Sequence, residues 1–149
     1  MSQSTEDPGT PLTNAVIARL PQLRPRIESF VPDGWDAVAA QALEDIALLA
    51  DETGVPILIA QSKEKFGDFR IYVNIDEPSI GPLEIVADTP EHTTVRSSAK
   101  PDSVRARAMQ IIDAAADRCT TICQHCGSLG RPRNTRGWLY VACDEHART

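Results

Sequence analysis

The last two dozen residues of the chain hold most of its good metal ligands. The stretch CQHCGSLGRPRNTRGWLYVACDEH, residues 123–146, contains three of the four cysteines and two of the three histidines of a 149-residue chain. Four of these residues form two pairs, Cys123-x2-Cys126 and Cys143-x2-His146, with 16 residues between them. Two residues between ligands allow a tight turn to direct both side chains at one ion. The spacing therefore predicts a site for one zinc ion.

The redox compartment decides how the cysteines are interpreted. No apolar run approaches the roughly 18–20 residues of a membrane span, and no basic segment followed by an apolar one opens the chain. We therefore expect a cytoplasmic protein without a membrane partner. In a reducing compartment, clustered cysteines are more often metal ligands than disulfides.

The residues around the ligands predict a treble-clef-like zinc module over residues 119–149. Gly127 follows the second cysteine and suits a turn with positive φ, and CDEHA resembles the first turn of a short terminal helix, where ligands three positions apart share a face. Cys119 is an alternative fourth sulfur in place of His146, although a cysteine at a helix end is more often a small buried hydrophobe. His125 is expected to be solvated.

A zinc ion with four protein ligands leaves no open position for water, which favours a structural role. A nuclease of the histidine-asparagine-histidine type needs a general-base histidine on the hairpin, and no histidine lies between Cys126 and Cys143. His92 is isolated in a predicted polar loop, and no phosphate-binding glycine loop is present. No catalytic residue is predicted.

Residues 13–118 are predicted to form one α+β domain behind a disordered tail, residues 1–12. Apolar residues at helical spacing predict a helix from residue 33 to 50, with Asp33 as N-cap and Gly54 after its end. Strands beginning at Pro56 and Asp68 form a hairpin with SKEKFG as its connector, and a second helix ends at Cys119, with Asp102 or Ser103 as its cap. A short helix before Pro21 and two short strands, LEIVAD and TTVRS, complete the prediction. The order of elements favours a small antiparallel sheet covered by helices on one side.

Charge is distributed unevenly along the chain. Residues 1–99 hold 7 Lys and Arg against 16 Asp and Glu, whereas residues 100–149 hold 8 against 5. The net charge of −6 argues against nonspecific nucleic-acid binding over the whole surface. Arg131, Arg133 and Arg136 on the zinc hairpin are candidates to bind phosphates or an acidic partner, or are simply solvated. Trp138 is expected to pack on the module or on the main domain.

The predicted sheet offers a second candidate surface. Arg70 and Tyr72 share one strand face with Asn74, opposite the apolar residues, and Lys63 lies beside them in the connector of the hairpin. They form either a polar patch for a partner or an ordinary solvated face.

Several of these segments occur together in one group of proteins. KEKFGDFRIYV, residues 63–73, the preceding DGW and its helix, and the terminal CxxCG, GW and CDEH segments resemble uncharacterised small phage and prophage-borne bacterial proteins. The resemblance covers most of residues 33–147 but departs at GDFRIYV and at the acidic insert, residues 76–101. It implies a phage-related origin and brings no activity with it.

Three hypotheses follow from the sequence. The favoured one is a non-enzymatic, zinc-containing interaction protein, phage-related, that binds or inhibits a host protein. The alternative is a small nucleic-acid-binding accessory factor that uses the basic zinc hairpin. The second alternative is an enzyme with its site on the sheet face around Lys63, Arg70 and Tyr72.

Overall fold

The chain has an α+β fold in which three helices accompany small antiparallel sheets, as predicted. The computed structural model describes residues 10–76, 83–89, 92–97 and 103–148. The α-helices are α1 (Pro11–Arg19), α2 (Asp36–Thr53) and α3 (Val104–Cys119). The strands are β1 (Ile57–Lys65), β2 (Asp68–Ile75), β3 (Leu83–Thr89), β4 (His92–Ser97), β5 (Arg131–Thr135) and β6 (Trp138–Ala142). Short 3-10 helices, η1 to η3, span Pro21–Leu23, Asp33–Trp35 and Asp144–His146.

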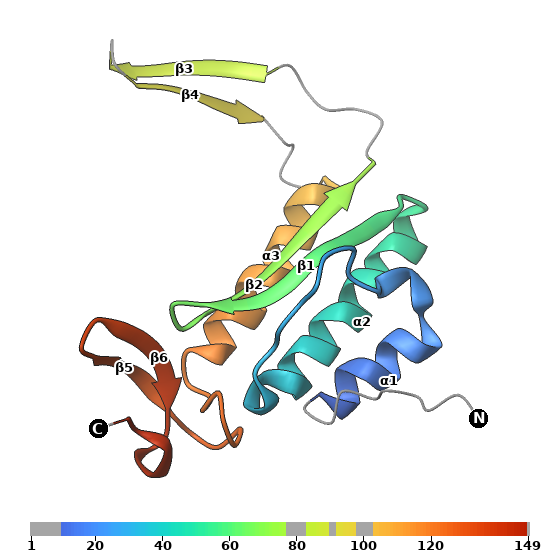
Figure 1. Cartoon of the computed structure of the whole chain (residues 1–149). Coiled ribbons are helices and arrows are strands. Elements are labelled where there is room, and N and C mark those ends of the chain that lie inside the picture. The colour runs from blue at the N-terminus through green and yellow to red at the C-terminus, as the bar shows by residue number, and fades with distance from the viewer. Residues whose placement is uncertain (1–9, 77–82, 90–91, 98–102, 149) are drawn as a thin grey trace.

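The main body has two layers, with the β1–β2 hairpin on one side and the helices on the other (Figure 1). Helix α2 packs against both α1 and α3, and α3 also contacts β2. The core between the layers is apolar and contains Trp35, Leu43, Ile46, Ile59 and Phe69, each at most 2% exposed. The sheet is therefore covered on one face only, as the alternation along β2 indicates.

The β1–β2 hairpin turns at Phe66 and Gly67, which both have positive φ, 53° and 78°. A two-residue turn of this kind matches the twist of the strands and places Gly at its second position. The buried face of β2 holds Phe69 and Ile71, and Tyr72 lies on the exposed face. The preceding segment, residues 26–30, runs along the outer edge of β1 and is hydrogen-bonded to it.

The prediction that Asp33 is the N-cap of α2 is wrong, and Asp36 has a capping role that was not predicted. The α-helix begins at Asp36, its N-cap is Trp35, and Asp33 instead opens the 3-10 helix η2. The Asp36 carboxylate is 5% exposed and accepts hydrogen bonds from the N–H groups of Leu12 (2.8 Å) and Thr13 (2.9 Å). It thereby caps the N-terminus of α1 from a neighbouring helix, which no local sequence pattern indicates.

Helix α1 begins at Pro11, within the range predicted as a tail, and residues 1–9 lie outside the described residues. The two short strands predicted in the insert form as β3 and β4, which pair with each other in a separate sheet. His92, expected in a loop, is the first residue of β4. No helix in the described ranges has the length and hydropathy needed to cross a membrane.

Candidate metal centre

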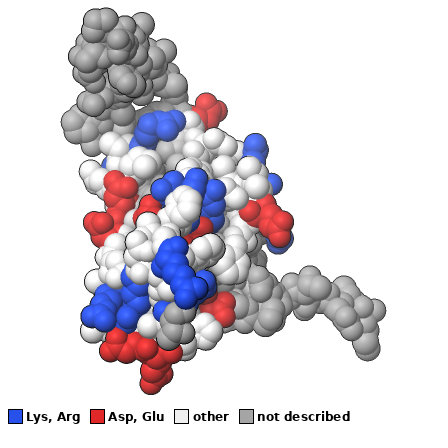
Figure 2. Space-filling model, turned by 60° about the vertical axis from the view of Figure 1, so that its left-hand side comes forward, with Lys and Arg blue, Asp and Glu red and all other residues white. Residues whose placement is uncertain are grey.

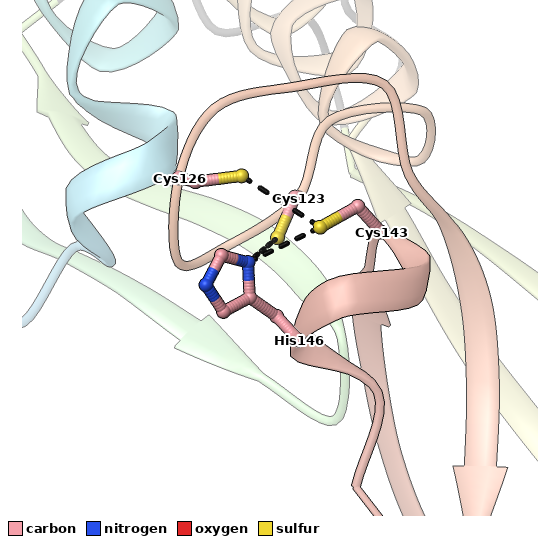
Figure 3. Close-up of side chains that lie close together, drawn as sticks. All are labelled: Cys123, Cys126, Cys143 and His146. Atoms are coloured by element: carbon pink, nitrogen blue, oxygen red, sulfur yellow. Dashed lines mark hydrogen bonds between the residues drawn. The ribbon is translucent and has the colours of Figure 1, made fainter.

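The four predicted ligands come together at the C-terminal end of the chain (Figure 3). The sulfur atoms of Cys123, Cys126 and Cys143 and a ring nitrogen of His146 all lie within 4.8 Å of one another. Three separations are short: Cys126 Sγ to Cys143 Sγ is 3.7 Å, Cys123 Sγ to His146 Nδ1 is 3.7 Å, and Cys143 Sγ to His146 Nδ1 is 3.1 Å. These residues, the Cys3His cluster, can hold a metal ion.

The three short separations are close to those of tetrahedral coordination. An ion about 2.3 Å from each sulfur and about 2.0 Å from the nitrogen places neighbouring ligand atoms roughly 3.5–3.8 Å apart. Two of the three short separations match that range, and the third is a few tenths of an ångström shorter. His146 presents Nδ1 to the cluster, and its Nε2 points away from the sulfurs (Figure 3).

The first ligand pair lies on a tight turn that we call the knuckle, residues 123–127. The N–H of Gly127 donates to the carbonyl of Cys123 (3.0 Å), and Gly127 has φ of 77°. Burial opposes ionisation of Cys123, but the backbone N–H groups of Cys143, Cys126 and His125 outweigh it and lower the thiol pKa to about 6. The turn therefore favours the thiolate, which is the form that binds metal.

The second ligand pair follows β6. Cys143 precedes the 3-10 helix η3, and His146 is its last residue. The predicted start of an α-helix is therefore a single 3-10 turn, which still places ligands three positions apart on one side. The β5–β6 hairpin before it turns at Arg136 and Gly137, with φ of 53° and 84°, the same two-residue geometry as in the β1–β2 hairpin.

Arg133 connects the hairpin to this second pair. Its Nε donates to the carbonyl of Ala142 (3.0 Å), and its Nη2 donates to the carboxylate of Asp144 (2.7 Å). The hydrogen bond from Arg133 and the charge of nearby Arg131 hold the pKa of Asp144 below its usual value. The Arg133 side chain is only 16% exposed, whereas that of Arg131 is 71% exposed. Among the three predicted hairpin contacts, Arg131 and Arg136 are exposed and Arg133 is engaged within the module.

The knuckle rests on the residues that open α2. The indole Nε1 of Trp35 donates to the carbonyl of Ile122 (2.9 Å), and the N–H of Gly34 donates to the carbonyl of Gln124 (2.8 Å). A Cβ on Gly34 would lie 1.9 Å from the carbonyl oxygen of Cys123, so only glycine fits there. From the sequence, Trp35 was expected in the core of the helix and Gly34 had no predicted role, although both belong to the DGW segment of the resemblance.

Cys119 and His125, the other Cys and His residues near the cluster, do not belong to it. Cys119 is 1% exposed within the apolar core, and burial raises its thiol pKa to about 12. It therefore behaves as the small buried hydrophobe that the sequence favoured. His125 is exposed, as expected, and its ring centroid lies 4.1 Å from that of His146.

Trp138 was expected to pack on the module or on the main domain, and this expectation is wrong for most of its side chain. Its side chain is not packed away but is 58% exposed. The Cζ of Arg148 lies 5.4 Å from the centroid of the Trp138 ring and 5.4 Å from that of Tyr140. The two aromatic residues and Arg148 form a cation–π stack on one face of β6.

The predicted sheet-face residues lie together on the β1–β2 hairpin. Lys63 pairs with Arg70 in the register, the Nζ of Lys63 lies 5.6 Å from the ring centroid of Tyr72, and Arg70 Nη1 is 3.3 Å from the Tyr72 hydroxyl. The hydrogen bond from Arg70 lowers the pKa of Tyr72. On the side of the molecule that carries the β1–β2 turn and the Cys3His cluster, Lys and Arg form a band down the middle of the face and also reach its edges, with Asp and Glu on both sides of this band and below it (Figure 2).

Comparisons with protein-family models, with curated proteins and with solved structures gave no match.

Proposed function

We propose that this chain is a non-enzymatic interaction protein whose Cys3His cluster holds one structural zinc ion. The observation that supports this most strongly is the convergence of four ligand atoms within 4.8 Å. Three thiolates and one imidazole suit zinc, and the four residues would fill all four positions of a tetrahedral ion. A filled shell has no place for a reacting water, so the role we propose for the ion is to hold the module together.

The proposed zinc links parts of the chain that carry little apolar core of their own. The second apolar cluster contains Cys123, Tyr140 and Ala142, with Cys143 packed against it. So small a core is insufficient to hold a hairpin, a knuckle and a 3-10 turn in place without a metal. The ion would thus keep the module folded against Gly34 and Trp35.

We propose the exposed face of the β1–β2 hairpin as the surface for a protein partner. Tyr72 is 41% exposed, with the Lys63 ammonium close to its ring and the Arg70 guanidinium close to its hydroxyl. Tyrosine and arginine are the residue types most often responsible for binding energy in protein interfaces. The cations favour a partner with an acidic surface. The phage-related role and the inhibition of a host protein rest on the resemblance alone.

Two measurements test the proposal. Protein purified without chelator should contain about one zinc per chain by elemental analysis, and Cys143→Ser should lose it. Wild-type protein without zinc would remove the metal assignment.

Tagged protein should then retain a partner from nuclease-treated bacterial lysate, and Tyr72→Ala should release it. Arg131→Ala, an exposed change on the other hairpin, serves as the control. Retention that is unchanged in Tyr72→Ala would contradict the proposed surface.

A further inference from the structure

A groove of about 480 Å³ lies where the zinc-ligand module meets the edge of β1. The main body contributes Phe30 and Glu64 to its lining, and the module contributes Trp138, Arg148 and the two histidines, His125 and His146. Grooves of this size at the junction of two structural units are common places for small ligands. The protein-partner surface proposed above, around Tyr72, does not include any of these residues.

Two exposed aromatic residues give the groove its apolar lining. Phe30 is 68% exposed and Trp138 is 58% exposed. Both have a fixed backbone: the carbonyl of Phe30 accepts a hydrogen bond from the N–H of Glu64 (3.2 Å), and Trp138 lies in β6 opposite Thr135. Exposed rings on a rigid backbone offer flat surfaces on which a planar ligand can stack at low entropic cost.

The polar groups of the groove include both donors and an acceptor. Arg148 is positioned through its backbone, since its N–H donates to the Tyr140 hydroxyl (2.8 Å) and its carbonyl accepts from Thr135 Oγ1 (3.2 Å). One carboxylate oxygen of Glu64, Oε1, accepts from the N–H of Gly67 (2.9 Å), and the second accepts no hydrogen bond from the described residues. A second carboxylate, Asp33, also lines the groove. A ligand that fits therefore combines a flat apolar ring, hydrogen-bond donors for the carboxylates and one anionic group, placed at Arg148.

We propose that this groove binds an unpaired base of a single-stranded nucleic acid. The base stacks on Phe30 and Trp138, its exocyclic amino group donates to Glu64, and the adjoining phosphate pairs with Arg148. Carboxylates accept hydrogen bonds from the amino group of cytosine, so the carboxylate selects bases that carry such a group. Thymine and uracil lack it and should bind more weakly.

The charge distribution favours a single strand over a duplex. Lys and Arg form a band down the middle of the face that carries the module and also reach its edges, with Asp and Glu on both sides of this band and below it (Figure 2). The wider phosphate array of a duplex would meet these acidic residues, whereas one strand can follow the cations. The residues proposed to bind the strand differ from Arg131, Arg133 and Arg136, the hairpin arginines that the sequence suggested as phosphate ligands. The inference goes beyond the proposed protein partner but requires the same folded, metal-loaded module.

Fluorescence anisotropy of labelled 12-nucleotide strands tests the proposal with zinc-loaded, full-length protein at low salt. Oligo-dC and oligo-rC should bind, a duplex of the same length should bind at least about tenfold more weakly, and affinity should fall as salt rises. Phe30→Ala and Trp138→Ala should each weaken binding by about tenfold. Zinc content and circular dichroism verify that each variant is folded.

Two further variants separate this site from the alternatives. Glu64→Gln retains an oxygen for the N–H of Gly67 and should remove the preference for oligo-dC over oligo-dT. Tyr72→Ala, on the protein-partner surface, should leave strand binding unchanged. Absence of binding by every single strand, or binding unaffected by Trp138→Ala in folded protein, would overturn the proposal. Loss of zinc from the wild type would instead contradict the proposed function.

Discussion

Arg131 and Arg133 are alike in sequence and different in the folded module. They lie two positions apart on β5 and both reach Asp144, but Arg133 also donates to the carbonyl of buried Ala142. Removing Arg133 leaves that carbonyl without its side-chain donor, whereas Arg131 makes one exposed ion pair at 3.7 Å. Exposed pairs of this kind contribute little to stability.

We therefore expect Arg133→Ala to lower the free energy of unfolding by about 1–2 kcal/mol. Arg131→Ala, the matched control on the same strand, should change it by less than about 0.5 kcal/mol. Chemical denaturation of both zinc-loaded variants measures the difference. Equal effects would show that the hydrogen bond to Ala142 has no energetic importance.

Cys119 differs from the other three cysteines in its surroundings. Its thiol lies in the apolar core and its pKa is raised to about 12, whereas Cys123 is equally buried but has its pKa lowered to about 6, and Cys126 and Cys143 reach solvent. After zinc is removed, three thiols per chain should react with a thiol reagent near pH 8, and the fourth should react only after denaturation. Cys119→Ser should keep its zinc; a loss of zinc from this variant would place Cys119 among the ligands.

Among the helices, strands and turns, the features that depend on residues close together along the chain were predictable from the sequence. Ser103 caps α3 through its side chain, which accepts from the N–H of Ala106 (3.1 Å), and the capping pattern is local. The strands of the β1–β2 hairpin follow from alternation and from the Phe66–Gly67 turn. The ligand pairs follow from their spacing, since each pair is held by one short turn.

Contacts between distant segments were not predictable in the same way. Trp35 and Ile122 are 87 positions apart and meet through one indole hydrogen bond. The position of Trp35 in an amphipathic helix pattern accounts for its burial but does not identify the carbonyl that it reaches. The exposure of Trp138 depends on where the β5–β6 hairpin is packed, which its own sequence does not encode.

Gly34 offers a test of how the knuckle is supported. A methyl group at this position would overlap the carbonyl of Cys123, so Gly34→Ala should displace the knuckle and cost about 1–3 kcal/mol. Zinc affinity, measured by competition with a chromogenic chelator, should fall. Gly54→Ala, at a residue with positive φ and open space around it, should lower stability but leave zinc affinity unchanged. Unchanged affinity in Gly34→Ala would mean that the knuckle folds independently of the main body.

At the scale of the whole molecule, the described part of the module contacts the main body at several places, including the apolar core, which Val141 of β6 joins. The knuckle rests on Gly34 and Trp35, and the β1–β2 turn approaches β6, where a Cβ on Gly67 would lie 3.2 Å from the backbone of Tyr140. Both contacts use residues of the segments that carry the resemblance, DGW and KEKFG. The metal centre is thus packed against the body from two sides, and its coordination should be that of a rigid site.

X-ray absorption at the zinc edge of the loaded protein identifies the ligands of the proposed ion. We expect three sulfur ligands at about 2.3 Å and one nitrogen ligand at about 2.0 Å, with no bound water. Cys143→Ser should lose the metal or exchange one sulfur for oxygen, and Cys119→Ser should give the wild-type spectrum. A wild-type shell with four sulfurs, or with fewer than three sulfurs and a water molecule, would contradict the assignment of a closed Cys3His site.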